Sequence, residues 1–107
     1  MGGENITLTV TATNAAGQGR SALVDIGVPE SVPLSKEATL LVVFGVDKKE
    51  GPPDQFGPPQ NFALKGTSHE ISAGRYRVSV ALPAEQVAVK FMLWDGQRLL
   101  FEAKRIL

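Results

Sequence analysis

ITLTVTAT, residues 6–13, alternates apolar and threonine side chains without interruption. This period of two is typical of a β-strand that has one face in a core and the other in water. Ile6, Leu8 and Val10 are therefore expected to face inward, while the β-branched threonines suit the exposed side of a pleated strand. The residues from Asn14 to Gly19 then break the pattern with turn-forming types. The chain thus begins with a half-buried strand.

Similar patterns recur at short intervals along the rest of the chain. Strands are predicted at residues 21–28, 38–46, 75–82, 87–94 and 98–106, with a shorter one at 61–65. Residues 38–46 are apolar at both parities, which indicates a central strand covered on both faces. Asp95-Gly96 predicts a tight hairpin turn of type I′, because this dipeptide accepts the positive φ angles that the turn requires. About seven antiparallel strands without a helical segment favour an all-β fold, an immunoglobulin- or fibronectin-III-like β-sandwich, over a barrel.

The composition limits the classes of partner and chemistry. The 107 residues fit one domain, with residues 1–5 as a disordered start and residues 6–107 as a single sandwich. Eleven basic and eleven acidic residues give a formal charge of zero, which argues against nucleic acid as a partner. The absence of cysteine excludes disulfides, thiolate catalysis and zinc ribbons. No run of about 18 apolar residues occurs, so no membrane span is expected in the chain. Residues 1–4 lack the basic and apolar regions of a secretion signal, so any signal peptide is expected upstream.

The segment from residue 47 to residue 60 holds four of the seven prolines of the chain. Prolines cannot donate to a strand ladder, so a long exposed loop is predicted there. Asp47, Glu50 and Asp54 carry the carboxylate oxygens that calcium prefers. Two lysines between them oppose the build-up of negative charge, and the spacing matches no EF-hand. A solvated loop of mixed charge is the better interpretation, and no metal or cofactor is predicted.

Three further motifs have simple structural explanations. His69 stands beside Glu70, but acid–base catalysis also needs a nucleophile and an orienting partner, so a solvated loop histidine is expected. Pro52-Pro53 and Pro58-Pro59 favour polyproline II geometry, yet they lack clean P-x-x-P spacing for an SH3-type reader and are expected to stiffen the loop. Asn5-Ile6-Thr7 fits the glycosylation pattern, although an asparagine at the start of a strand is the better interpretation. The chain is therefore not expected to be an enzyme.

Phe56, Tyr76 and Trp94 carry flat rings of the kind that stack on sugars or bases. If the apolar residues of 87–94 face the core, then Lys90 and Trp94 point to the outer face of that strand. Tyr76 has the parity of a core residue. Trp94, Phe56 in the proline-rich loop, and Lys90 are therefore the candidate ligand contacts, with core or loop packing as the alternative.

The sequence VAVKFMLWD, residues 87–95, is similar to a valine-lysine-x-phenylalanine-x-tryptophan-aspartate strand found in a known family. Three other features match it: the apolar strand 38–46 followed by an aspartate, the leucine-proline step at 82–83, and the short apolar stretch 99–101. Over residues 22–107 the chain resembles the small immunoglobulin-like modules of large secreted bacterial proteins. The family usually has a longer segment after its tryptophan-aspartate pair, where this chain has a tight turn.

The resemblance implies a non-catalytic accessory module of an extracellular or cell-envelope protein, acting as a structural, adhesion or spacer element. Its expected partners are neighbouring domains of the parent protein, and polysaccharide or another surface protein. Two alternatives remain: a carbohydrate-binding module centred on Trp94 and the proline-rich loop, and a regulatory appendage of an enzyme. The outermost strands, predicted at 6–13 and 98–106, also carry a hypothesis of strand addition, with Lys104 and Arg105 blunting the second edge.

Overall fold

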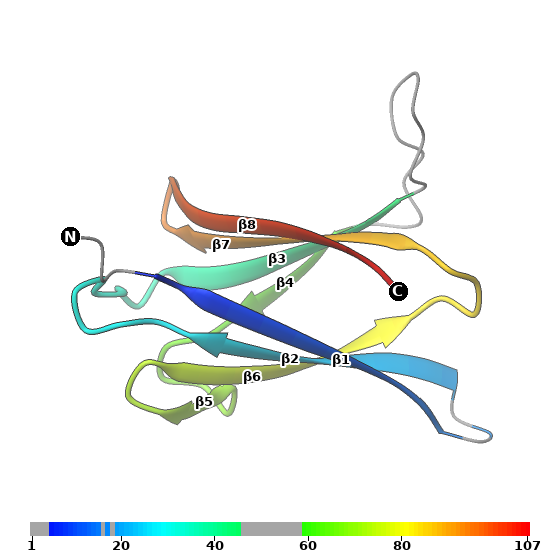
Figure 1. The fold of residues 1–107 in the computed structure, drawn as a ribbon. Coiled ribbons are helices and arrows are strands. Elements are labelled where there is room, and N and C mark those ends of the chain that lie inside the picture. Colours follow the sequence, from blue (N-terminus) through cyan, green and yellow to red (C-terminus); the bar gives the residue numbers. More distant parts are fainter. Residues whose placement is uncertain (1–4, 16, 18, 46–58) are drawn as a thin grey trace.

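Eight strands form two antiparallel sheets in the computed structural model of the chain, which describes residues 5–15, 17, 19–45 and 59–107. The strands are β1 (Thr7–Ala15), β2 (Gly19–Gly27), β3 (Ala38–Gly45), β4 (Gln60–Ala63), β5 (Glu70–Ser72), β6 (Arg75–Leu82), β7 (Ala88–Asp95) and β8 (Arg98–Ile106). One sheet has the order β1-β2-β6-β5 and is called sheet A; the other has the order β4-β3-β7-β8 and is called sheet B. The two sheets face each other (Figure 1). The prediction of an all-β sandwich is confirmed, with eight strands where about seven were expected.

The core lies between the inner faces of the two sheets. Buried and exposed residues alternate strictly along β6, and the same period runs through β2, β3 and β7. Apart from Leu64, which follows β4, the largest fully buried side chains come from these four middle strands and include Tyr76, Phe91, Ile26 and Leu40. No charged side chain is buried among the described residues. Burial of apolar surface at roughly 25 cal/mol per Å² is therefore the main force that holds the sheets together.

The predicted central strand is β3, which lies between β4 and β7. Its inward residues, such as Leu40 and Val42, are fully buried. Its outward residues Leu41 and Val43 are only half-buried, so the expectation that both faces are covered is not met for the outer one. The reason is architectural, because a two-layer sandwich buries only the inner side of each sheet.

The hairpin between β7 and β8 forms at the predicted place, but the prediction of a type I′ turn is wrong. Asp95 pairs with Arg98, so the two central residues of the turn are Gly96 and Gln97. Type I′ requires positive φ at both central positions, whereas only Gly96 has it, at 63°. Asp95 stays at the end of its strand because its carboxylate accepts hydrogen bonds from the amide and the hydroxyl of Ser35.

The two ends of the described chain lie at opposite ends of the sandwich (Figure 1). Thr7 pairs with Gly27 at the end where residues 28–37 cross from sheet A to sheet B. Ile106 pairs with Ala88 at the other end, where residues 83–87 cross from sheet A to sheet B again. β1 and β8 therefore run from the first end to the second.

Candidate functional site

Two of the three predicted ligand contacts lie on the outer face of sheet B. Trp94 and Lys90 belong to β7 and have the opposite parity to the buried Phe91 and Leu93, so the predicted outward orientation is confirmed. Phe56 lies outside the described residues. Trp94 and Lys90 are four residues apart on one strand, which separates them by about 13 Å along the face.

The neighbours of Trp94 make this outer face apolar at its centre. Trp94 is paired with Thr39 on one side and Leu99 on the other, and Met92 is paired with Leu41. Leu99 is 44% exposed, while Trp94, Met92 and Leu41 are half-buried. We call Leu41, Val43, Met92, Trp94 and Leu99 the Trp94 face.

The outer face of sheet A has a different character. Its rows hold the threonines of β1, and Asp25 pairs with Arg77 at 2.8 Å between Oδ1 and Nε. The two outer faces are therefore unlike: one is polar, and the other has an apolar centre.

The indole of Trp94 is only partly open to the surface. Its Nε1 atom is inaccessible to solvent and has no hydrogen-bond partner among the described residues. The N–H is thus not available to a ligand at the surface in this arrangement. The ammonium of Lys90 lies 3.1 Å from the carboxylate of Glu102 in an exposed ion pair, so its charge is already partnered.

The hypothesis that joined Trp94 to the proline-rich loop stays a prediction, because residues 46–58 lie outside the described residues. Trp94 is opposite Thr39, near the start of β3, whereas the segment from residue 46 to residue 58 follows Gly45 at the end of that strand. The calcium candidates Asp47, Glu50 and Asp54 also fall in that segment and lie outside the described residues.

His69 is not the solvated loop residue that the sequence predicted. Its Nδ1 lies 2.9 Å from the carbonyl oxygen of Ala63, so the ring donates a hydrogen bond from that nitrogen. The ring is half-buried and packs edge-on against Phe62 at 5.8 Å between centroids. Neighbouring Glu70 accepts a hydrogen bond from the amide of Gly66 at 2.9 Å. Both side chains therefore brace the turn between β4 and β5.

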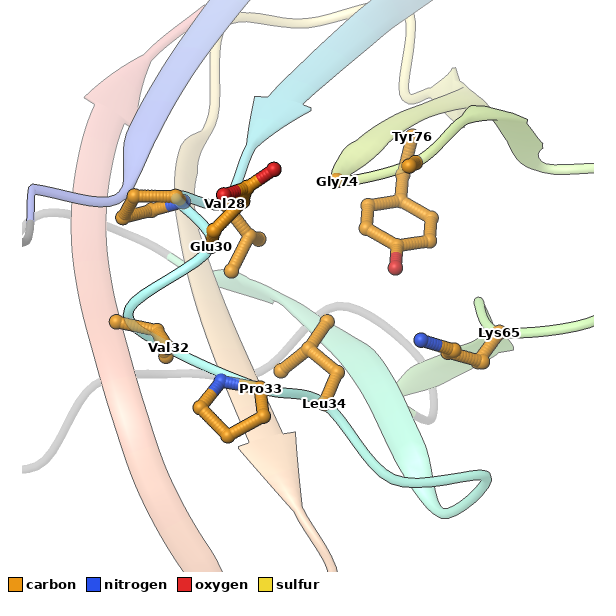
Figure 2. A pocket seen from close by; sticks show the side chains of 10 residues that line it. Val28, Glu30, Val32, Pro33, Leu34, Lys65, Gly74 and Tyr76 are labelled. Atoms are coloured by element: carbon orange, nitrogen blue, oxygen red, sulfur yellow. The ribbon is translucent and has the colours of Figure 1, made fainter.

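A pocket of about 230 Å³ opens at the end of the sandwich where residues 28–37 cross between the sheets. Val28, Val32 and Leu34 form its apolar side, and Lys65 and the turn at Gly74 close the other side (Figure 2). Its volume is below the roughly 300–1,000 Å³ of sites that enclose drug-sized ligands. The pocket is large enough for a few water molecules or one small group.

A backbone contact holds the two walls of this pocket together. The amide of Val28 donates a hydrogen bond of 2.7 Å to the carbonyl of Gly74. Gly74 has a φ of 77°, and a Cβ at this position would lie 2.5 Å from the carbonyl oxygen of Val28. Glycine is therefore required here both by the left-handed conformation and by the close approach of the two backbones.

Tyr76 supplies the polar group inside the pocket. The residue is 2% exposed, and its hydroxyl points into the space that the side chain of Lys65 enters from the other side (Figure 2). Burial, and after it the negative charge of Glu70, raises the pKa of the Tyr76 hydroxyl above its usual value of 10.0. A phenol and an ammonium in an apolar recess can hydrogen-bond a small polar group.

Within the described part of the chain, no three or more histidine or acidic side chains gather where they could hold a metal ion. The same residues contain no helix with the length and apolarity that crossing a bilayer requires. No family model, curated protein or solved structure matches the chain.

Proposed function

We propose that the chain is a non-catalytic, immunoglobulin-like structural module that holds adjoining parts of a larger bacterial surface or secreted protein at a fixed separation. The observation that carries this proposal is the placement of the two terminal strands. β1 begins at one end of the sandwich, and β8 finishes at the other. β1 is paired along its length with β2 in sheet A, and β8 is paired along its length with β7 in sheet B. Such a unit transmits a pull from one end to the other through both sheets.

The direction of the hydrogen bonds favours resistance to that pull. Antiparallel ladders have bonds perpendicular to the strands. A force applied along β1 toward its start, and along β8 toward its finish, therefore loads all bonds of each ladder together. The last residue is also held, because Leu107 and Val87 exchange two backbone hydrogen bonds of 2.8 and 2.9 Å.

Contacts made by residues 83–87 close the same end of the sandwich. Nη1 of Arg20, at the start of β2, donates hydrogen bonds to the carbonyl oxygens of Pro83 at 3.1 Å and of Glu85 at 2.7 Å. Residues 83–87 are thereby tied to sheet A while they lead into sheet B.

Single-molecule force spectroscopy tests the proposal. The chain has no cysteine, so handles can be attached at chosen pairs of introduced cysteines. Pulling between Asn5→Cys and Leu107→Cys shears both terminal ladders, whereas pulling between Asn5→Cys and Glu30→Cys unzips β1 from β2 one bond at a time. We expect a several-fold higher unfolding force in the first geometry. Equal forces in the two geometries would remove the support for a load-bearing role.

Polysaccharide binding at the Trp94 face is the second candidate, favoured by the partly exposed Leu99 beside Trp94. Trp94 is the only tryptophan, so its fluorescence reports on this face alone. Titration with soluble xylan, β-glucan and peptidoglycan fragments should give a saturable change if sugars bind here. Trp94→Ala should then abolish retention on the same polymer, while Leu23→Ala on the opposite sheet should retain it. An unchanged fluorescence spectrum with all three polymers would exclude sugar binding at this face and would leave the structural role as the single candidate.

A further inference from the structure

The four outer edges of the two sheets are protected against strand pairing to different degrees. β4 has four residues, and β5 has three with a shift in register. β8 is long, but it has a register irregularity near Trp94 and carries Arg98, Glu102, Lys104 and Arg105. Short length, bulges and charges are the devices by which proteins blunt exposed strand edges.

β1 has none of these devices. It is nine residues long, it contains no charged residue and no proline, and its register with β2 is continuous from Thr7 to Ala15. In the described part of the chain it is the end strand of its sheet, so its outer side presents unpaired backbone donors and acceptors. It is thus the one long, regular and uncharged edge among the four.

The side chains of β1 are also incompletely covered. Leu8 and Val10 pack against the core cluster, yet they remain half-buried, unlike their cross-strand neighbours Ile26 and Val24. On the other face Thr9 and Thr11 are exposed. A further strand placed beside β1 would bury the remaining apolar surface on one face and extend the row of threonines on the other.

The sequence of β1 selects its own copy as that strand. The pattern Thr-Leu-Thr-Val-Thr-Ala-Thr, residues 7–13, has the same alternation when read in either direction from Val10. An antiparallel pair centred on Val10 sets Thr9 against Thr11 of the second copy and Leu8 against its Ala12. Every threonine then meets a threonine and every apolar residue an apolar one, which is the pairing that favours strand association. A charged partner strand would gain nothing from an edge without charges.

We propose that two copies of the chain associate through antiparallel pairing of their β1 strands about a two-fold axis at Val10. The two A sheets then form one continuous sheet with the order β5-β6-β2-β1-β1-β2-β6-β5. A single strand edge buries less surface than the roughly 1,200–2,000 Å² of standard interfaces, so association in the micromolar range is expected.

Sedimentation analysis of the whole chain from about 1 μM to about 1 mM tests the association. The double variant Thr9→Lys, Thr11→Lys places like charges opposite each other at two positions and should weaken dimerisation at least tenfold, by roughly 1.4 kcal/mol or more. The variant Thr9→Lys, Thr11→Glu sets each lysine against a glutamate of the second copy and should restore it. Ser79→Lys, Ala81→Lys puts the same charge on the same face but on β6, and should dimerise as the unsubstituted chain does.

Disulfide trapping provides a second measurement that needs no change of charge. Residues directly opposite in an antiparallel pair have Cα atoms about 4.5–5.5 Å apart, within the range that a disulfide spans. Val10→Cys should therefore cross-link with its own copy, whereas Leu8→Cys should not, because its copies would be offset by four residues, about 14 Å. The proposal is overturned if the chain stays monomeric up to about 1 mM, if both double variants of β1 behave alike, or if the two cysteine variants cross-link equally.

Discussion

A comparison of Gly74 with Gly66 separates two contributions to the loss of stability on replacing glycine by alanine: the strain of the left-handed backbone and the steric clash of the added Cβ. Both residues have a φ of 77°, so alanine at either position must adopt the left-handed conformation. A Cβ at Gly66 would meet nothing within 4 Å, whereas a Cβ at Gly74 would lie 2.5 Å from the carbonyl oxygen of Val28. Gly66→Ala is therefore a matched control for Gly74→Ala.

The expected magnitudes follow from these two geometries. Left-handed backbone costs an L-residue roughly 1–2 kcal/mol, and the reduced entropy of the unfolded chain returns about 0.4–1 kcal/mol. Gly66→Ala should thus lower the free energy of unfolding by about 1 kcal/mol. In Gly74→Ala the carbonyl of Val28 must also move away, which breaks the 2.7 Å hydrogen bond from the amide of Val28. Leaving that buried N–H unpaired adds about 1–3 kcal/mol.

Thermal unfolding followed by circular dichroism measures the difference. A domain of this size has an unfolding entropy of about 0.2 kcal/mol per kelvin. The melting temperature should therefore fall by roughly 10–20 °C for Gly74→Ala and by about 5 °C for Gly66→Ala. Equal losses at the two positions would refute the argument that the Val28–Gly74 approach is tight enough to exclude a side chain.

Three further predictions concern the core, the buried phenol and the surface ion pair. Phe91→Ala should cost roughly 3–5 kcal/mol in chemical denaturation because the ring is fully buried, while exposed Lys90→Ala should change stability by less than about 1 kcal/mol. Because the pKa of Tyr76 is raised in the folded chain, its hydroxyl ionises at lower pH in the unfolded chain than in the folded one. The contribution of the neutral Tyr76 hydroxyl to stability is therefore complete below pH 10.0 and is lost as the pH rises through the folded pKa. Tyr76→Phe should remove this loss of stability at alkaline pH, as measured in denaturation curves. Asp25→Asn should cost no more than about 1 kcal/mol, because the side chains of Arg77 and Asp25 are 54% and 30% exposed; a larger loss in the same assay would contradict the screening argument.

Strand bounds could be predicted accurately from the sequence where an alternation of apolar and polar residues ended at a glycine, a proline or a tight turn. The bounds of β6 and β8 agree with the predicted 75–82 and 98–106, since Gly74 and Pro83 flank the first and the hairpin begins the second. β5 was not predicted, because three residues carry no period and the strand exists only through its pairing with β6. The turn after β7 was predicted one residue too early, because Asp95 belongs to the strand. The carboxylate of Asp95 is bonded to Ser35, 60 residues away, and the local sequence carries no sign of that contact.

Parity also predicted the outer position of Trp94 and Lys90, but not what surrounds them. The register of β7 with β8 shifts between Leu93 and Trp94, so the residues opposite Trp94 cannot be counted back from the turn. The pocket was missed for a similar reason. The bond between Val28 and Gly74 joins its two walls, and no local pattern in the sequence records that contact.

The pairing of the middle strands has a consequence for how the chain reaches its fold. Ile26 of β2 is paired with Tyr76 of β6, and Val42 of β3 with Phe91 of β7, so each sheet is built around partners about fifty residues apart. The first half of the chain supplies one middle strand to each sheet, and the second half supplies the other. Contacts of such long sequence separation place sandwiches among the slow folders, on the order of milliseconds to seconds. On a ribosome the interior would therefore stay wet until β7 has emerged.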